Sequence, residues 1–337
     1  MRKYQKALPQ LGDRLFMTDG GLETTLIYHG GFELPSFAAF DLLRSPGGTE
    51  ALRDYFEGYA RMARRYELGL VLESPTWRAN PDWASRIGYD AALLAAANAS
   101  SIDMLQEIRD TYETPTTPIV ISGNIGPRGD GYVADRRMTA RQAYDYHAPQ
   151  VETFAASDAD MVAAFTMNYV EEAIGVVKAA QAHATPVAIS FTLETDGRLP
   201  SGETLEHAIM KTDAETALYA AYYMINCAHP THFAHVLADN PPWSCRIRGL
   251  RANASTRSHA ELDASTDLDA GDPEKLAIQY RALAEVLPAL NVVGGCCGTD
   301  DRHVDRICSV LIASQGFGDS STVVGTASPR ARRSMFT

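Results

Sequence analysis

The chain has 337 residues, of which 45% are hydrophobic and 21% charged, a composition typical of a globular protein with a sizeable core. Acidic residues outnumber basic ones by 42 to 30, giving a net charge of −12, and this balance argues against a nucleic-acid partner. The five cysteines are an odd number in a chain long enough to fold without disulfides, which argues against a disulfide scaffold. Because neither a secretory signal nor a membrane-spanning apolar stretch is present, we expect a cytoplasmic protein with reduced thiols.

Eight short apolar segments, each ending in a polar or glycine-containing turn, are predicted as β-strands. In chain order they are Leu15–Thr18, Leu68–Leu72, Pro118–Ser122, Met161–Ala164, Val187–Leu193, Tyr222–Ile225, Ile247–Leu250 and Asn291–Val293. Segments with apolar residues at three- and four-residue steps lie between the strands and predict helices, namely Thr49–Tyr66, Ala91–Tyr112, Thr139–Ser157, Glu171–His183 and Asp272–Leu287.

This alternation of strands and helices predicts an α/β fold with a parallel sheet, and eight units predict a (β/α)8 TIM-type barrel in a single domain. The alternative, a doubly wound open sheet, is disfavoured because no G-x-G-x-x-G motif follows a strand. We assign residues 1–315 to the barrel. Residues 316–337 are rich in Gly, Ser, Thr and Arg and predict a flexible C-terminal tail.

Three cysteines follow predicted strands: Cys227 ends the sixth strand, and the adjacent Cys296 and Cys297 end the eighth. Since the carboxyl ends of barrel strands meet on one face, we expect the three sulfurs to lie close together. Three thiolates that leave a fourth position open are typical of a catalytic zinc site. Adjacent cysteines fit a shared ion better than a disulfide, because a bridge between neighbours distorts the peptide that joins them.

Glycines flank the cysteine pair and are expected to let the backbone turn sharply around it, at Gly294, Gly295 and Gly298. The alternative to a metal site is that the cysteines are buried as small apolar residues. We expect the remaining two, Cys245 and Cys308, to be plain core or helix residues without a role in the site.

Several motifs carry a resemblance to a known family. They are TDGGLETTL at Thr18–Leu26, SGNIGPRGDGYVAD at Ser122–Asp135, SFTLETDGRLPSGETL at Ser190–Leu205, INC at Ile225–Cys227 and VVGGCCGT at Val292–Thr299. In these motifs and their order, the chain resembles the zinc-dependent homocysteine S-methyltransferases. The resemblance implies a (β/α)8 barrel with Zn²⁺ held by Cys227, Cys296 and Cys297. It also implies methyl transfer from an onium donor (S-methylmethionine, S-adenosylmethionine or a betaine-like compound) to the thiolate of homocysteine, giving methionine.

The resemblance also assigns residues around the metal. Asp19 matches the acidic residue of the family's Asp-Gly motif and is expected to be a catalytic and substrate-binding residue; the alternative is a turn-forming aspartate before two glycines. Gly20 would let the backbone approach the substrate, and Asn226 of the INC motif is expected to bind it. Trp77 and Trp83 follow the second strand and either line the donor pocket or pack within their loop.

The chain departs from the family after the fourth predicted strand, where the family has a glutamate that binds the amino group of the acceptor. Phe165 takes that place and is expected to face the substrate. An ammonium group without a carboxylate partner would be poorly bound, so we expect Glu73 or Glu194, each at a strand end, to supply the charge. The other possibility is an acceptor thiol that has no amino group.

We therefore predict a cytoplasmic zinc-dependent methyltransferase whose partners are a small-molecule thiol and a methyl donor. The alternatives are a methyltransferase for a different small thiol, a zinc-dependent barrel hydrolase or lyase, and a non-catalytic zinc- or thiol-binding barrel. Hydrolase sites more often use histidine and carboxylate ligands, and no histidine pair lies at the strand ends. The oligomeric state stays open.

Overall fold

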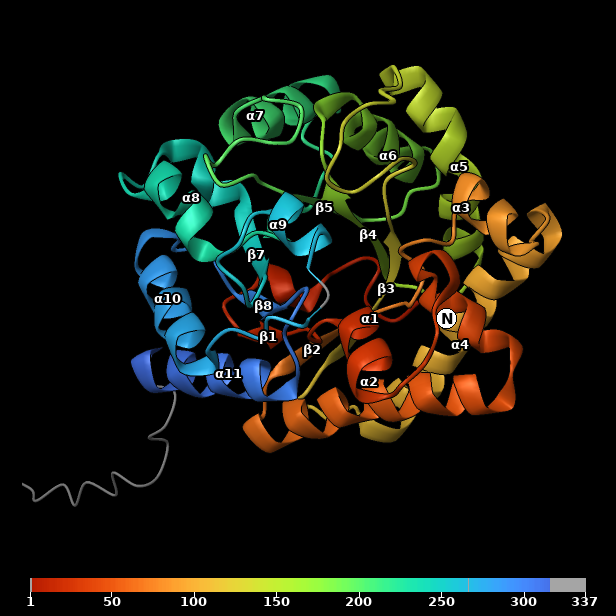
Figure 1. Ribbon diagram of the computed structural model, residues 1–337, viewed down its shortest axis with the longest axis horizontal. Helices are drawn as coiled ribbons and strands as arrows, with labels where there is room; N and C mark the ends of the chain where they lie inside the picture. The colour runs from red at the N-terminus through yellow and green to blue at the C-terminus, as the bar shows by residue number, and fades with distance from the viewer. Residues whose placement is uncertain (1, 266, 316–337) are drawn as a thin grey trace, which may run out of the picture.

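The molecule is a closed barrel of eight parallel strands surrounded by helices (Figure 1). The structure is a computed structural model and describes residues 2–265 and 267–315. Each strand pairs in parallel with the next, and β8 pairs with β1, so the sheet closes. The strands are β1 Phe16–Met17, β2 Gly69–Glu73, β3 Ile119–Ile125, β4 Met161–Met167, β5 Val187–Phe191, β6 Tyr222–Asn226, β7 Ile247–Ala252 and β8 Val292–Gly295. The predicted (β/α)8 barrel is confirmed, and the open-sheet alternative is wrong.

Helices cover the outside of the barrel. They are α1 Leu22–Thr24, α2 Pro46–Tyr66, α3 Pro81–Ala84, α4 Ala91–Tyr112, α5 Ala140–Ala156, α6 Val170–Ala182, α7 Leu205–Glu215, α8 Pro230–Leu237, α9 His259–Asp263, α10 Pro273–Val286 and α11 Asp301–Gln315. The five predicted helices all occur, with bounds within three residues of those expected. At the start of α5, for example, Thr139 and Gln142 form a capping box, which satisfies the free N–H groups of the first turn.

Side-chain alternation along the strands separates two apolar layers. On β2, Leu70 and Leu72 pack toward the helices while Val71 packs inside the barrel. The inner layer is filled by residues from every strand but β7, among them Phe16, Val71, Val120, Ala163, Ala188, Met224 and Val292. Gly69 is required here, since a Cβ atom on it would lie 2.3 Å from the Phe16 ring.

A buried ion pair ties elements together near the amino ends of the strands. Arg109 Nη1 on α4 lies 2.6 Å from Asp160 Oδ2, just before β4, and both side chains are almost completely buried. Asp160 also accepts hydrogen bonds from the backbone N–H groups of Tyr4 and Ile121, so the pair joins the N-terminal segment to β3. Such pairing offsets much of the free-energy cost of burying the two charges.

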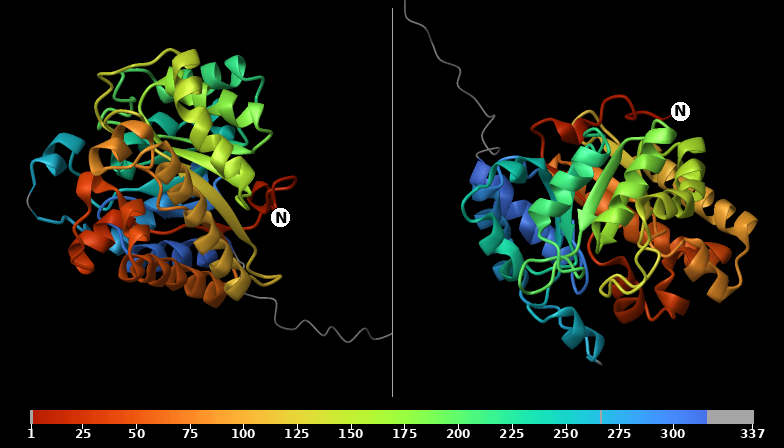
Figure 2. Two further views of the ribbon diagram at one scale, coloured as in Figure 1. Left: turned by 90° about the vertical axis from the view of Figure 1, so that its right-hand side faces the viewer. Right: turned by 90° about the horizontal axis from the view of Figure 1, so that it is seen from above.

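The two ends of the barrel differ. The N-terminus lies at one end, and the segment around α9 projects from the opposite end (Figure 2). The predicted tail, residues 316–337, lies outside the described residues. Among the described helices, none combines the length and the apolar character needed to cross a membrane.

Candidate metal and substrate site

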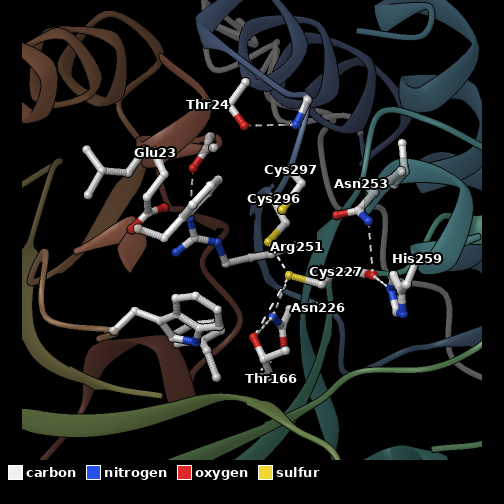
Figure 3. Close-up of a pocket in the computed structure, with 18 of the residues that line it drawn as sticks. Glu23, Thr24, Thr166, Asn226, Cys227, Arg251, Asn253, His259, Cys296 and Cys297 are labelled. Atoms are coloured by element: carbon white, nitrogen blue, oxygen red, sulfur yellow. Dashed lines mark hydrogen bonds between the residues drawn. The ribbon is translucent and has the colours of Figure 1, made fainter. Parts of the chain in front are cut away.

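A cavity of about 300 Å³ opens at the carboxyl ends of the strands (Figure 3). Residues at or after the ends of every strand except β5 line it, and the segment after β7 that includes α9 closes one side. This is the face on which barrel enzymes carry their chemistry.

Three thiols meet in this cavity. Cys227 follows β6, and Cys296 and Cys297 follow β8, with all three sulfur atoms within 4.8 Å of one another. The Sγ atoms of Cys227 and Cys296 lie 2.6 Å apart, and all five cysteines of the chain are free. The hydroxyl oxygen of Tyr132 lies 3.6 Å from Cys297 Sγ. A group of three thiols at this spacing can hold a metal ion.

Cys227 is fixed by its neighbours. Its backbone has a φ of +53°, a left-handed conformation that few residues other than glycine adopt. Asn226 Nδ2 donates a hydrogen bond of 3.1 Å to Cys227 Sγ, while Asn253 and His259 donate to the Cys227 carbonyl oxygen. The side-chain oxygen of Asn226, Oδ1, in turn accepts from the Thr166 backbone N–H. These bonds set the direction of the sulfur, so Asn226 lies beside the thiols and orients one of them.

The glycines around the cysteine pair act differently from one another. Only Gly298 has a positive φ, of +79°. A Cβ atom on Gly294 would lie 1.9 Å from Thr18 Oγ1, and one on Gly295 would lie 2.1 Å from Thr299 Oγ1. The expectation that all three provide a sharp turn is therefore wrong for Gly294 and Gly295, which allow close packing instead.

The electrostatics of the cluster favour ionisation of one thiol. Hydrogen bonds from the neighbouring thiols of Cys227 and Cys297 hold the pKa of Cys296 well below its usual range, and the charge of Arg251 adds to the effect. The thiolate is the form that binds metal, so this environment prepares the cluster for a cation.

A buried ion pair lies beside the thiols. Arg251 Nη2 on β7 is 2.7 Å from Asp19 Oδ1, and the other Asp19 oxygen accepts from the Tyr55 hydroxyl at 2.9 Å. Arg251 also donates to the carbonyl oxygens of Gly20 and Gly295, so it ties together the ends of β1, β7 and β8. Burial raises the pKa of Asp19, with Arg251 and Tyr55 opposing the shift. The predicted residues Asp19 and Gly20 do line the cavity, and both are held by Arg251.

The two candidate glutamates lie in different places. Glu73 is 3% exposed and lines the cavity, and burial raises its pKa to about 7. Glu194 does not line the cavity; its carboxylate lies 3.2 Å from His259 Nδ1, and about a third of the side chain is exposed. The strand β5 ends at Phe191, two residues before the predicted end, so the chain turns before Glu194. Glu194 therefore contacts the outer side of the site rather than the cavity.

Aromatic rings form another wall. Phe165 on β4 faces the cavity, with the Arg251 guanidinium carbon 5.2 Å from the centre of its ring. Trp77 also lines the cavity, whereas Trp83 does not: it stacks on Arg78, whose other face packs on Trp77. Of the two tryptophans, only Trp77 is placed to contact a bound molecule.

The remaining cysteines lie away from the thiol cluster. Cys308 is buried on α11, and Cys245 is exposed in a short helical turn before β7, so both are core or helix residues. Sequence analysis missed Arg251, Tyr132 and His259. The charged residues within the otherwise apolar segment of β7 were a signal for Arg251, while Tyr132 lies in the loop after β3 and His259 begins α9, in segments whose paths are set by tertiary contacts.

The site and fold define a (β/α)8 barrel enzyme with a thiol cluster on its catalytic face. The sequence profile of the homocysteine S-methyltransferase family matches residues 16–311, so the chain belongs to this family of methyltransferases. The resemblance identified from the motifs is confirmed.

Solved structures of the homocysteine methyltransferase MmuM from Escherichia coli are similar to this chain. The oxidised form has a TM-score of 0.72 and 20% sequence identity, covering 91% of this chain and 99% of that one. The metallated form has a TM-score of 0.68 and 20% identity, covering 90% and 98%. At this level of identity the likeness shows a shared fold.

Proposed function

We propose that this protein is a zinc-dependent thiol methyltransferase that moves a methyl group from an onium donor to the thiolate of homocysteine, giving methionine. The observation that carries the proposal is the cluster of Cys227, Cys296 and Cys297 in the wall of an open cavity, with the sulfurs within 4.8 Å of one another. Family membership supports the reaction class.

The residues present fit a zinc ion. Three thiolates are ligands that zinc prefers, and three protein ligands leave one position for a substrate. When bound there, Zn²⁺ lowers the pKa of a coordinated thiol, so that a thiolate nucleophile is available at neutral pH. The bonds to Cys227 from Asn226, Asn253 and His259 orient that ligand, and Arg251 supplies positive charge beside the cluster. Such surrounding contacts tune ligand orientation in metal sites.

The cavity walls suit a cationic donor. Phe165 and Trp77 line the cavity, and the faces of aromatic rings attract positive groups such as sulfonium or quaternary ammonium. We infer that these rings contact the onium part of the donor. We also place the protein in the cytoplasm, because its thiols must stay reduced to bind metal.

The proposal is tested by metal analysis together with turnover. The purified protein is expected to hold about one zinc per chain, as in a single three-cysteine site. The Cys296→Ser variant should lose the zinc, and Cys245→Ser, which changes an exposed cysteine away from the cluster, should keep it. A panel of thiols and onium donors is then followed by mass spectrometry. Methylated homocysteine is the expected product, while zinc binding without methylation of any thiol would contradict the proposal and favour a non-catalytic barrel.

A further inference from the structure

The floor of the cavity is a layer of side chains from the even-numbered strands. Val71, Ala163, Met224 and Val292 point into the barrel from β2, β4, β6 and β8. Because side chains alternate along a strand, the residues two positions further on also point inward, one layer nearer the cavity. This upper layer consists of Glu73, Phe165, Asn226 and Gly294.

Glu73 is the ionisable member of this layer, and one of its carboxylate oxygens lacks a hydrogen-bond partner among the described residues. The side chain is 3% exposed, and its Oε2 atom is buried without a hydrogen-bond partner in the part of the chain that the structure describes, although Arg251 and Ser122 oppose the rise in the pKa of the carboxyl. Within residues 2–265 and 267–315, no ion pair to Glu73 is formed by any lysine, arginine or histidine. The nearby Arg251 is already paired with Asp19 at 2.7 Å. Burying a carboxylate without a partner is costly, so a cation brought by a ligand would relieve the cost.

The other carboxylates near the site are engaged or more solvated. Asp19 forms an ion pair with Arg251 and accepts a hydrogen bond from a tyrosine hydroxyl, and Asp130 accepts from two backbone N–H groups of its own loop. Glu194 does not line the cavity and contacts His259, which does. Glu23, on the short helix α1, also lines the cavity, and burial raises its pKa to about 7, but its side chain is more exposed to solvent than that of Glu73.

The geometry points to Glu73 as the residue that binds the primary ammonium group of an amino-acid thiol acceptor, and so selects homocysteine over thiols that lack the amino group. A primary ammonium carries N–H donors that satisfy the unpartnered Oε2 atom, which the methyl groups of a betaine-type donor do not. The donors S-methylmethionine and S-adenosylmethionine also carry an amino group, so the donor KM is measured alongside the acceptor preference. This inference rests on the proposed methyltransferase function and adds the residue that determines acceptor specificity.

The test compares two acceptors that differ in one group, homocysteine and 4-mercaptobutanoate, at a saturating donor. In the wild-type enzyme kcat/KM is expected to favour homocysteine. Glu73→Gln should lower kcat/KM for homocysteine by about 30-fold or more and change that for 4-mercaptobutanoate less than threefold. Glu152→Gln is the matched control, because it removes the same charge from an exposed position on α5 and should leave the preference unchanged.

A binding measurement separates failure of the inference from failure of the proposed function. Methionine and 4-(methylthio)butanoate are the corresponding products and are titrated calorimetrically against wild-type and Glu73→Gln proteins of equal zinc content. Loss of the preference for methionine in Glu73→Gln supports the inference even if no thiol is methylated. An unchanged preference in both assays overturns it, as does a Glu73→Gln enzyme in which only the donor KM rises, since Glu73 would then bind the donor.

Discussion

Replacing Glu73 by glutamine should make the protein more stable at alkaline pH. Burial raises the Glu73 pKa from its ordinary value of 4.5 to about 7, with Arg251 opposing the shift and Asp19 adding to it. At pH 8 the carboxyl is ionised in both the folded and unfolded states, so the free energy of unfolding is lowered by the full amount that corresponds to the pKa shift. Each pKa unit corresponds to about 1.4 kcal/mol, so the cost at pH 8 is about 3 kcal/mol.

Glutamine keeps the shape of the side chain and removes the charge. Its buried amide has a cost of its own, about 1 kcal/mol, so the net gain expected for Glu73→Gln at pH 8 is about 2 kcal/mol. The direction in which stability changes with pH follows from the number of protons bound by the folded and unfolded states. Between pH 4.5 and 7 the folded wild-type protein holds more protons than the unfolded chain at this site, so its stability falls as pH rises. Below pH 4.5 the carboxyl is neutral in both states and the gain should vanish.

The assay is urea unfolding of wild-type and Glu73→Gln proteins at pH 5, 6, 7 and 8. Reductant and a metal chelator in both samples prevent metal binding from contributing to the difference. The charged and titratable groups that face Glu73 are Asp19, Arg251 and Tyr222. All three are present in both proteins, so their own titration contributes about equally to both unfolding free energies and cancels in the difference. A stability difference that is the same at pH 5 and pH 8, or a less stable variant at pH 8, would refute the reasoning, because it would mean that Glu73 is already paired or hydrated.

Three further substitutions test the packing and charge pairing of the barrel. Arg109→Ala leaves the carboxylate of Asp160 unpaired and should lower the free energy of unfolding by about 3–5 kcal/mol, measured with urea. The zinc content of the folded protein should stay unchanged, because the ion pair lies at the opposite end of the barrel. Arg251→Met should cost a similar 3–5 kcal/mol by leaving Asp19 unpaired; adding Asp19→Asn should recover part of the loss, and a double variant no more stable than the single one would argue against the pair. Gly69→Ala should destabilise the protein by about 1–3 kcal/mol, because the added methyl group would overlap an aromatic ring inside the barrel; an unchanged melting temperature would show that the ring can move away.

The sequence alone determined the architecture and the thiol cluster. Strand and helix periodicities are local properties, and eight alternating units were enough to predict the closed barrel. The approach of Cys227 to Cys296 and Cys297 also followed, although they are about 70 positions apart, because parallel strands place their carboxyl ends on one face. Only the order of the strands was needed for that inference.

The tertiary structure decided which strand-end carboxylate faces the cavity. Glu73 lies within β2, so alternation from Val71 turns it inward, whereas β5 ends at Phe191 and the following turn directs Glu194 to His259. The two glutamates are equivalent by sequence position. They differ because the length of a strand depends on its pairing with its neighbours, which is not a local property.

The pairing of Arg251 with Asp19 likewise depended on tertiary structure, since the two residues are brought together by the contact of β1 with β8 and of β8 with β7. His259 is placed by the loop after β7, which folds back over the cavity. Local sequence patterns fix the side to which a side chain points within a strand, but long-range packing decides which loops cover a site and which charges meet inside it.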